Sequence, residues 1–160
     1  ENTAFTVQYD FCMPDRFNLT YVTSDGSEQR PVVVHRSSIG AIERVMAFLI
    51  EHYAGAFPVW LAPVQVKVLP IGETHHDYAE NIAKELRAHD IRVEIDATNE
   101  SLGKRIRSAK MEKTPYLMVV GGKEIEGKTV SLEGRKEGAL GSKSLTEAID
   151  LIITEITERR

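Results

Sequence analysis

The sequence of 160 residues predicts an α/β protein in two parts. Residues 1–61 are expected to form antiparallel strands followed by a helix, and residues 62–160 an α/β domain. Two observations support this prediction. Segments of alternating polarity come first, and strand-like and helix-like patterns then alternate along the rest of the chain. Between them lies FPVWLAPVQ, rich in proline and aromatic residues, which we interpret as a joint with its boundary near Ala62.

The first part contains three strand-like segments and one helix-like segment. Alternating polarity predicts strands over 5–11, 18–23 and 30–35, with the turn signal SDGS before the third. Apolar residues from Ile39 to Tyr53 then recur at helical spacing, and Gly55 and Pro58 end that helix. Because so few strands cannot bury a sheet, we expect this part to need further strands. Alone it would be disordered or would pair through exposed strand edges.

The second part alternates between strands and helices. Strands are predicted over 64–71, 91–97, 115–121 and 129–134. Helices are predicted from a cap at Thr74, over 101–113, and from a capping box of Ser144 and Glu147. A hairpin-like turn is expected at Gly127. This order implies a mixed, mostly parallel sheet flanked by helices.

Composition and charge narrow the class of protein. Hydrophobic residues make up 42% and charged residues 28% of the chain, which is typical of a soluble globular protein. The longest apolar run is too short to span a bilayer, and no secretory signal is visible, so no membrane partner is expected. The single cysteine, Cys12, excludes an internal disulfide and suits a reducing compartment such as the cytoplasm. A start at Glu1 instead of Met suggests a chain that begins within a longer protein.

The net charge of −4 means that nucleic-acid binding would depend on a local basic patch. One such patch is predicted on the helix at 101–113, whose net charge is +4. Its cations are Lys104, Arg105, Arg107, Lys110 and Lys113. This composition fits a footprint on a phosphate backbone, and it fits a solvated helix face equally well. Nearby, Asn99 and Glu124 carry amide and carboxylate groups that match donors and acceptors on unpaired bases.

Two residues of the first part could act on small ligands. Arg44 lies near the start of its helix, where a guanidinium can reach a phosphate; the alternative is a surface arginine paired with Glu43. His35 ends a predicted strand, and a neutral imidazole there can ligate zinc. The alternative is a hydrogen-bonded structural histidine, since Cys12 and His35 show no metal-ligand spacing.

Longer stretches of the sequence resemble one family. RPVVVHRSSIGAIERVMAFLIEHYAGAFPVWLAPVQV resembles the third signature motif of threonyl-tRNA synthetases and the junction after it, and TVQYDF and PDRFNLTYV resemble the preceding strands. NESLGKRIRSAKMEKTPYLMVVGGKEIEGKTVSL resembles the family's anticodon-binding domain. The resemblance covers nearly the whole chain from Thr6 onward. It implies the end of an antiparallel class II catalytic sheet with its motif 3 helix in 1–61, and an anticodon-binding domain in 62–160.

The function that this resemblance implies is that of a threonine–tRNA ligase, which activates threonine with ATP and transfers it to the threonine tRNA. For the full-length enzyme it implies a homodimer. Alternatives are a tRNA-binding module without catalysis, a related class II synthetase for proline, glycine or histidine, and a structural α/β domain without RNA contact. The retained His35 before Arg44 is most similar to the threonine enzyme.

The resemblance also implies roles for residues of the first part. Arg44 resembles the motif arginine that holds the ATP γ-phosphate, and Gln8 resembles a strand residue that lines the threonine pocket. His35 resembles one of three protein ligands of a zinc ion that binds the amino and hydroxyl groups of threonine and so selects against valine. The other two ligands, a Cys and a His, lie upstream in the family. This chain alone is therefore not expected to hold zinc tightly or to form threonyl-adenylate.

In the second part, the resemblance places Asn99, Arg107 and Glu124 at positions similar to those that contact the anticodon. Lys104 joins them as a tRNA-binding candidate from the basic helix. Two residues depart from the family pattern. Glu133 stands near the anticodon where the family usually has a basic residue, and Ala41 stands where many members have a serine near the adenosine.

Overall fold

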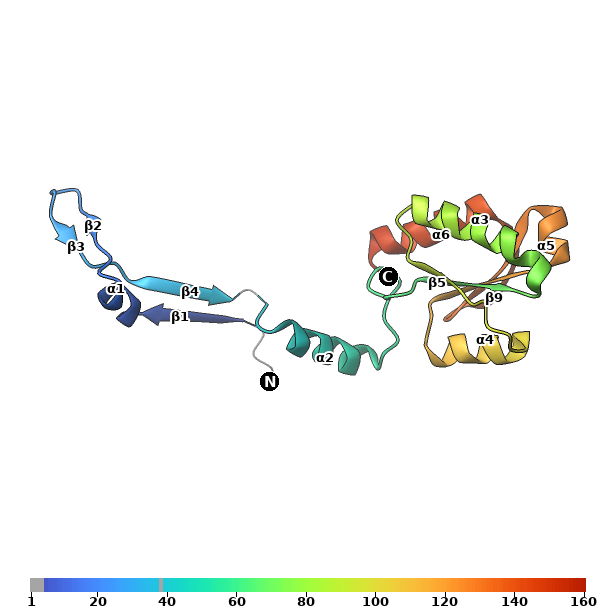
Figure 1. The fold of residues 1–160 in the computed structure, drawn as a ribbon, viewed down its shortest axis with the longest axis horizontal. Helices are drawn as coiled ribbons and strands as arrows, with labels where there is room; N and C mark the ends of the chain where they lie inside the picture. The colour runs from blue at the N-terminus through green and yellow to red at the C-terminus, as the bar shows by residue number, and fades with distance from the viewer. Residues whose placement is uncertain (1–4, 38) are drawn as a thin grey trace. The chain divides into compact units, whose positions relative to one another are not determined.

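The computed structural model describes residues 5–37 and 39–160. The chain forms two compact units, one that runs up to His52 and one from Tyr53 to Arg160 (Figure 1). The boundary expected near Ala62 lies inside the second unit. As the boundary between two functional domains it stays a prediction.

The first unit is built on two antiparallel strands. β1 (Thr6–Asp10) pairs with β4 (Val33–Ser37). Between them the chain forms helix α1 (Cys12–Arg16) and a hairpin of β2 (Tyr21–Val22) and β3 (Glu28–Gln29). Helix α2 (Ile42–Tyr53) follows β4. The antiparallel strands and the helix are confirmed, but the strand expected over 18–23 is shorter than predicted and α1 has no counterpart in the prediction.

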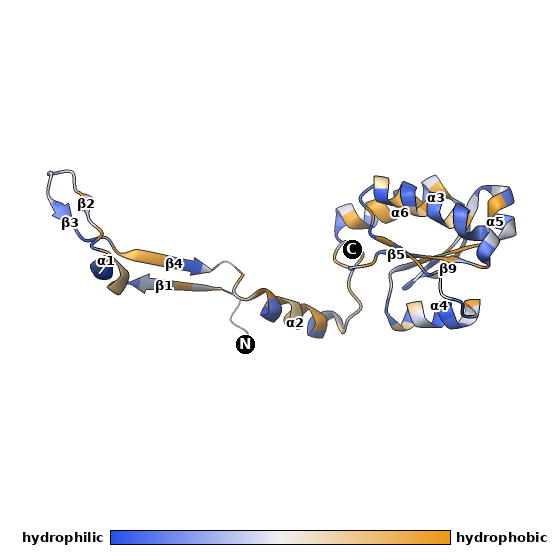
Figure 2. Ribbon diagram, in the orientation of Figure 1, coloured by the Kyte–Doolittle hydropathy of each residue, from blue (hydrophilic) through white to orange (hydrophobic). Residues whose placement is uncertain are grey.

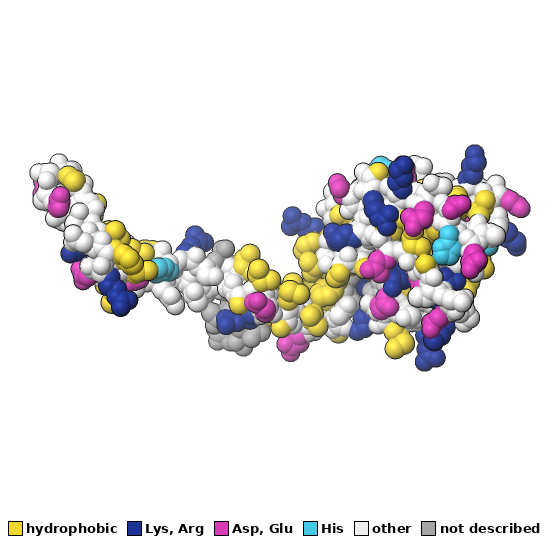
Figure 3. All heavy atoms as spheres, viewed as in Figure 1, with side chains coloured by type: hydrophobic (Ala, Val, Ile, Leu, Met, Phe, Trp, Pro, Cys, Tyr) yellow, Lys and Arg dark blue, Asp and Glu magenta, His cyan; other side chains and the backbone are white. Residues whose placement is uncertain are grey.

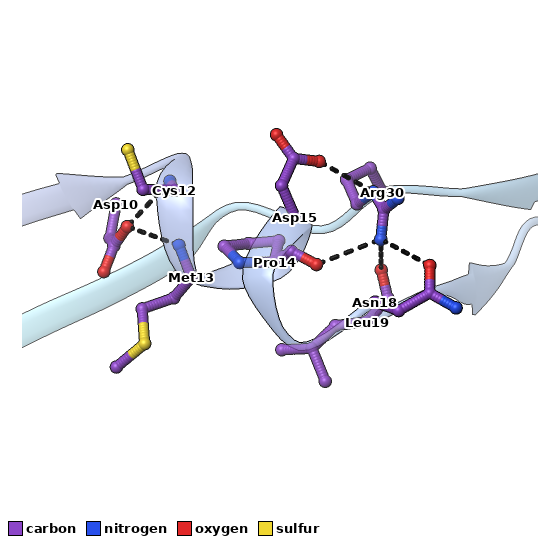
Figure 4. Close-up of polar contacts among 8 residues, drawn as sticks. All are labelled: Asp10, Cys12, Met13, Pro14, Asp15, Asn18, Leu19 and Arg30. Carbon is purple, nitrogen blue, oxygen red and sulfur yellow. Dashed lines mark hydrogen bonds and ion pairs between the residues drawn. The ribbon is translucent and has the colours of Figure 1, made fainter.

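Polar side chains shape the connection from β1 to β2. Asp10 Oδ1 accepts hydrogen bonds from the N–H groups of Cys12 and Met13, at 2.8 and 2.9 Å, at the start of α1 (Figure 4). The Arg30 guanidinium contacts four residues of α1 and the turn after it: Pro14, Asp15, Asn18 and Leu19. These bonds satisfy the turn locally, without a hydrophobic core beneath it.

The first unit exposes most of its apolar side chains. Among its described residues only Pro14 is buried, whereas Tyr9 and Ile42 keep 69% and 70% of their surface exposed. Figure 3 shows hydrophobic side chains spread over the visible face of this unit. Burial of apolar surface is the dominant favourable term in folding. The contacts within this unit therefore do not supply a core, as the sequence predicts.

The second unit contains a five-stranded mixed sheet in the order β6-β5-β7-β8-β9. Its strands are β5 (Val66–Pro70), β6 (Val93–Ile95), β7 (Tyr116–Val120), β8 (Thr129–Gly134) and β9 (Gly138–Ser144). β6, β5 and β7 run parallel, and β8 and β9 continue the sheet antiparallel. The mixed sheet is confirmed. β9, whose glycines weaken a strand pattern, is absent from the prediction and makes the antiparallel share larger than expected.

Helices cover both faces of this sheet. α3 (His76–Ala88) and α6 (Leu145–Glu158) lie on one face and α4 (Leu102–Met111) lies on the other, while α5 (Gly122–Gly127) follows β7 (Figure 1). Figure 2 shows apolar and polar residues alternating around α3 and α6, as amphipathic helices require. The main core on their side includes Val68, Ile82, Met118 and Ile152, none more than 1% exposed. Under α4 a smaller cluster contains Leu69, Ala109 and Leu117.

Three local predictions have different outcomes. The capping box is confirmed, since Ser144 Oγ accepts from the Glu147 N–H and Glu147 Oε2 accepts from the Ser144 N–H. The cap at Thr74 is wrong, because Thr74 lies inside a 3-10 turn (Glu73–His75) and His75 precedes α3. The turn at Gly127 is also wrong. This residue ends α5, and Lys128 then takes the left-handed φ of 51° that terminates a helix.

Residues 53–62, which include most of the joint predicted over 57–65 and are called the joint segment below, pack within the second unit. Guanidinium groups donate to four of its backbone carbonyls: Arg135 to Ala56 and Phe57, and Arg92 to Trp60 and Ala62. Val59 is 5% exposed, and its N–H donates to Arg160 O at 3.0 Å. The segment interpreted from its prolines as a joint is thus an ordered part of the second unit.

Candidate functional site

Two predicted RNA-contacting residues lie at the same edge of the five-stranded sheet. Asn99 follows the carboxyl end of β6, and Glu124 follows that of β7, with β5 parallel between the two strands. Neighbouring strands are about 4.8 Å apart, so the two segments leave the sheet about 10 Å from each other. Ligands of open α/β sheets bind outside the carboxyl ends of parallel strands. This edge is therefore a candidate binding site.

Glu124 is half-buried and already bonded at this edge. Its Oε2 accepts a hydrogen bond from the Gly121 N–H at 3.0 Å at the start of α5. A side chain at position 121 would collide with Ile71, because an added Cβ would lie 2.5 Å from Cδ1 of that residue. The close approach fixes the start of α5 and, with it, the place of Glu124. One carboxylate oxygen, Oε1, is left to accept from a ligand.

Helix α4 presents fewer unpaired cations than its sequence suggests. Lys104 is exposed, but its Nζ lies 2.5 Å from Oε1 of Glu100, one turn earlier. Arg107 is also exposed, and its side chain makes no ion pair or hydrogen bond with any residue in 5–37 or 39–160. Of the cations predicted to form the patch, Arg107 is the one most available to a phosphate.

The C-terminal end of α4 uses its cations inside the protein. Lys110 Nζ lies 2.5 Å from Oε1 of Glu133 on β8. Lys113 Nζ donates to the carbonyl of Ala54 in the joint segment. Glu133, where the resemblance implies a basic residue, therefore neutralises the neighbouring cation Lys110.

Arg105 is a structural residue, and its assignment to a surface patch is wrong. Only 4% of its surface is exposed. Its guanidinium donates to Asp96 O at 3.0 Å and to Pro70 O at 2.8 Å, which joins α4 to the carboxyl ends of β6 and β5. The remaining Nε atom is buried and makes no hydrogen bond within the described part of the chain. The residue orients α4 and does not reach a ligand.

The sequence-based prediction missed the role of Lys67 in the central strand. Only 8% of the surface of Lys67 is exposed. On the α4 side of β5, its Nζ pairs with Glu112 and lies 3.7 Å from Oε2 of Glu94. Its pairing ties the C-terminal end of α4 to the sheet. The signal in the sequence is a single lysine within the apolar run VKVLP, and neither partner is near it in the chain.

In the first unit, the structure brings Gln8 and His35 together. They are direct partners across the antiparallel β1–β4 ladder, so their side chains share a face. Asp10 shares it too, and its Oδ2 lies 2.9 Å from Nε2 of His35. The Met13 N–H and the His35 contact hold the pKa of Asp10 below its usual range, so Asp10 is a carboxylate at neutral pH.

Arg44 lies in the first turn of α2, as the sequence predicts, and its side chain is exposed. The alternative pairing with Glu43 is not formed, and the guanidinium has no other ion-pair partner in the described stretches of the chain. The backbone carbonyl of Ala41 accepts a hydrogen bond from the Arg44 N–H at 3.1 Å. A guanidinium that is exposed at a helix start can meet an anionic ligand.

Two other kinds of feature are absent from the described residues. They contain no group of three or more His, Cys, Asp or Glu side chains that could hold a metal ion. Within the same residues, no helix is both long enough and apolar enough to cross a membrane. His35 and its neighbour Asp10 therefore do not belong to a group of three such side chains within 5–37 and 39–160.

Comparison with known protein families divides the chain into two parts, much as the structure does. Residues 65–155 match the protein family described as "Anticodon binding domain". The chain belongs to this family. In this anticodon-binding-domain protein, residues 2–53 match a second family, "tRNA synthetase class II core domain (G, H, P, S and T)". Asn99, Arg107 and Glu124 lie in the first match, and His35 and Arg44 in the second.

Relatives of this anticodon-binding-domain protein are named threonine–tRNA ligases. The chain is 51% identical over 154 residues to the ligase of Caldanaerobacter subterraneus, across 96% of this chain and 24% of the relative. Against the ligase of Clostridium perfringens it is 48% identical over 159 residues, across 99% of this chain and 25% of the relative. The resemblance to the C-terminal region of threonyl-tRNA synthetases is confirmed. The chain spans about a quarter of the length of these relatives.

A solved structure shows the same fold. It is the crystal structure of the RNA binding domain of threonyl-tRNA synthetase from Cryptosporidium parvum, with a TM-score of 0.75 and 33% sequence identity. The similarity covers 95% of this chain and 39% of that chain. The α/β architecture and the order of its parts are therefore shared with a threonyl-tRNA synthetase.

Proposed function

We propose that this chain is the part of a threonine–tRNA ligase that binds the tRNA anticodon and contributes residues to the active site. One observation carries the proposal. A class II core segment and an anticodon-binding domain occur in one chain, at about 50% identity to ligases named for threonine over 96% of its length. The same observation favours the threonine enzyme over the prolyl, glycyl and histidyl alternatives.

The second unit would bind the threonine tRNA at the carboxyl edge of its sheet and along α4. Glu124 Oε1 and the exposed Asn99 amide can bond the edges of unpaired bases. Arg107 supplies a phosphate contact, and Lys104 can exchange its exposed partner Glu100 for a phosphate. Arg105 and Lys67 fix α4 to the sheet.

The first unit would supply three residues to the activation of threonine. Arg44 neutralises charge on the ATP phosphates, which an exposed guanidinium can do. Gln8 and His35 share a face of the β1–β4 ribbon, as residues of one amino-acid pocket must. Zinc, when bound, supplies a Lewis acid for the amino and hydroxyl groups of threonine. His35 fits as one ligand, and the others have to come from outside the described residues.

The proposal includes a homodimeric, cytoplasmic full-length enzyme that uses ATP and zinc. The alternative function, a tRNA-binding module without catalysis, is favoured by the difference between the two units. The second unit has its own buried core, whereas the first buries only Pro14 among its described residues. RNA binding is therefore the activity that this segment can retain alone.

Threonine-dependent exchange of pyrophosphate into ATP by the full-length ligase tests the catalytic proposal. We expect exchange with threonine and not with proline, glycine or histidine, and its loss in Arg44→Ala. Arg87→Ala is the matched control, because Arg87 is exposed on α3 in the other unit. Unchanged exchange in Arg44→Ala would contradict the role of Arg44, and exchange with another of these amino acids would contradict the assignment to threonine.

A further inference from the structure

Asp10 is held by hydrogen bonds at both of its carboxylate oxygens. Oδ1 accepts from the N–H groups of Cys12 and Met13 at 2.8 and 2.9 Å (Figure 4), and Oδ2 lies 2.9 Å from Nε2 of His35. The Asp10 side chain is 21% exposed, against 47% for His35. The two N–H donors at the start of α1 give this carboxylate one orientation.

A carboxylate oxygen 2.9 Å from one imidazole nitrogen selects the tautomer of a neutral histidine. Asp10 Oδ2 can only accept, so Nε2 of His35 carries the proton and donates it to the hydrogen bond. Nδ1 then presents its lone pair, and it has no hydrogen-bond partner among residues 5–37 and 39–160. Carboxylates that bond the far nitrogen of an imidazole fix its ring orientation and raise its basicity toward metals.

We infer that Asp10 is the positioning residue for His35 as a zinc ligand, and that it directs Nδ1, not Nε2, to the metal. The inference rests on the proposed function, since it assumes that His35 binds zinc. Asp10 itself touches neither metal nor substrate. It acts through His35. Helix α1 contributes to this positioning because its first N–H groups hold the Asp10 carboxylate.

Zinc affinity of the full-length ligase, measured by competition with a chromophoric chelator, tests this role. We expect Asp10→Asn to weaken zinc binding roughly 10–100-fold. The asparagine Oδ1 can still accept from the N–H groups of α1, but its amide donates toward Nε2 and favours the tautomer that protonates Nδ1. Asp15→Asn is the matched control, because Asp15 lies on the same helix and pairs with Arg30. Its zinc affinity is expected to be unchanged.

A crystal structure of the zinc-loaded wild-type ligase supplies a second readout that needs no variant. We expect zinc on Nδ1 of His35 and Asp10 on Nε2. Zinc on Nε2, or equal affinity in Asp10→Asn and wild type, would overturn the positioning role. The variant His35→Ala separates a failure of the positioning role of Asp10 from a failure of the proposed zinc role of His35. Loss of zinc in His35→Ala with unchanged affinity in Asp10→Asn defeats only the inference, whereas retention of zinc in His35→Ala defeats the zinc role of His35 itself.

Discussion

Lys110 on α4 and Glu133 on β8 form an ion pair, with Nζ and Oε1 2.5 Å apart, at a hollow of about 280 Å³ between helix and sheet. The resemblance to the family led us to expect a basic residue at position 133, and Glu133 reverses that charge. The pair therefore cancels a cation on the surface proposed to bind RNA. Arg135, the residue directly after β8, holds the joint segment, so this strand end serves both the candidate RNA surface and the packing of residues 53–62.

Removing the charge of Glu133 should strengthen tRNA binding. In Glu133→Gln, Lys110 is no longer paired and can contact a phosphate. We expect the slope of log affinity against log salt to become steeper by roughly one, with tighter binding at low salt. The measurement is tRNA binding by the full chain over a range of stated salt concentrations. Lys110→Gln should lack this gain, and a Glu133→Gln slope equal to wild type would show that Lys110 lies outside the interface.

Arg105 and Arg107 are two residues apart, but the same substitution should destabilise the protein at Arg105 and leave its stability nearly unchanged at Arg107. Arg105→Met leaves the carbonyls of Asp96 and Pro70 without their donor, which should lower the free energy of unfolding by about 2–4 kcal/mol. Arg107→Met should change it by less than about 0.5 kcal/mol, because Arg107 is exposed. Urea unfolding of the second unit measures both values. Equal losses of stability would contradict the structural role assigned to Arg105.

For tRNA binding, the prediction for Arg107 concerns affinity. Arg107→Met should weaken binding several-fold and reduce the salt slope by roughly one, since a phosphate contact is lost. Arg87→Met is the matched control, because Arg87 is exposed on α3, on the sheet face opposite α4. If both variants weaken binding equally, the effect reflects net charge and not a specific contact.

The joint segment should contribute to the stability of the second unit. A chain that starts at Ala62 lacks buried Val59 and the carbonyls of Ala56 and Phe57 that accept from Arg135. We expect it to unfold at lower urea concentration than a chain that starts at Tyr53, by at least about 2 kcal/mol. Equal stabilities would support the boundary near Ala62 as the start of the folded domain.

The capping box of α6 should be visible in a pH titration. The Ser144 hydroxyl, followed by its N–H, holds the pKa of Glu147 below its usual 4.5. A carboxylate whose pKa is lowered on folding stabilises the fold above the unfolded-state value and loses this contribution as pH falls through the folded-state value. NMR titration of the Glu147 carboxyl should show its pKa rising toward 4.5 in Ser144→Ala. An unchanged pKa would mean that the hydroxyl does not bond the carboxylate in solution.

Periodicity in the sequence predicts much of the second unit. The alternation of strand and helix patterns gives β5, α3, β6, α4, β7, β8 and α6, and the pair Ser144 and Glu147 predicts the start of α6 correctly. The sequence does not predict β9, because its glycines weaken the strand pattern. It does not predict α5, because a glycine at each end makes this short helix resemble a turn. Local pattern is weakest where glycine dominates.

The candidate site could be predicted only in part. Positions such as Asn99, Glu124 and Arg44 fall at strand or helix ends, which the sequence marks. Which cations are unpaired depends on contacts between distant elements, such as Lys110 with Glu133, and no local pattern reveals them. The +4 charge of residues 101–113 therefore overstated the basic surface, because pairing and burial are tertiary properties.

The most direct test of the account is binding of the full chain to the threonine tRNA and to the same tRNA with an altered anticodon, at two stated salt concentrations. The account predicts tighter binding to the unaltered tRNA at both concentrations, with a difference that Glu124→Gln reduces, since the Glu124 carboxylate is placed at the base-reading edge. Equal affinity for both tRNAs at both salt concentrations would contradict anticodon recognition by this chain and leave only contact with the phosphate backbone.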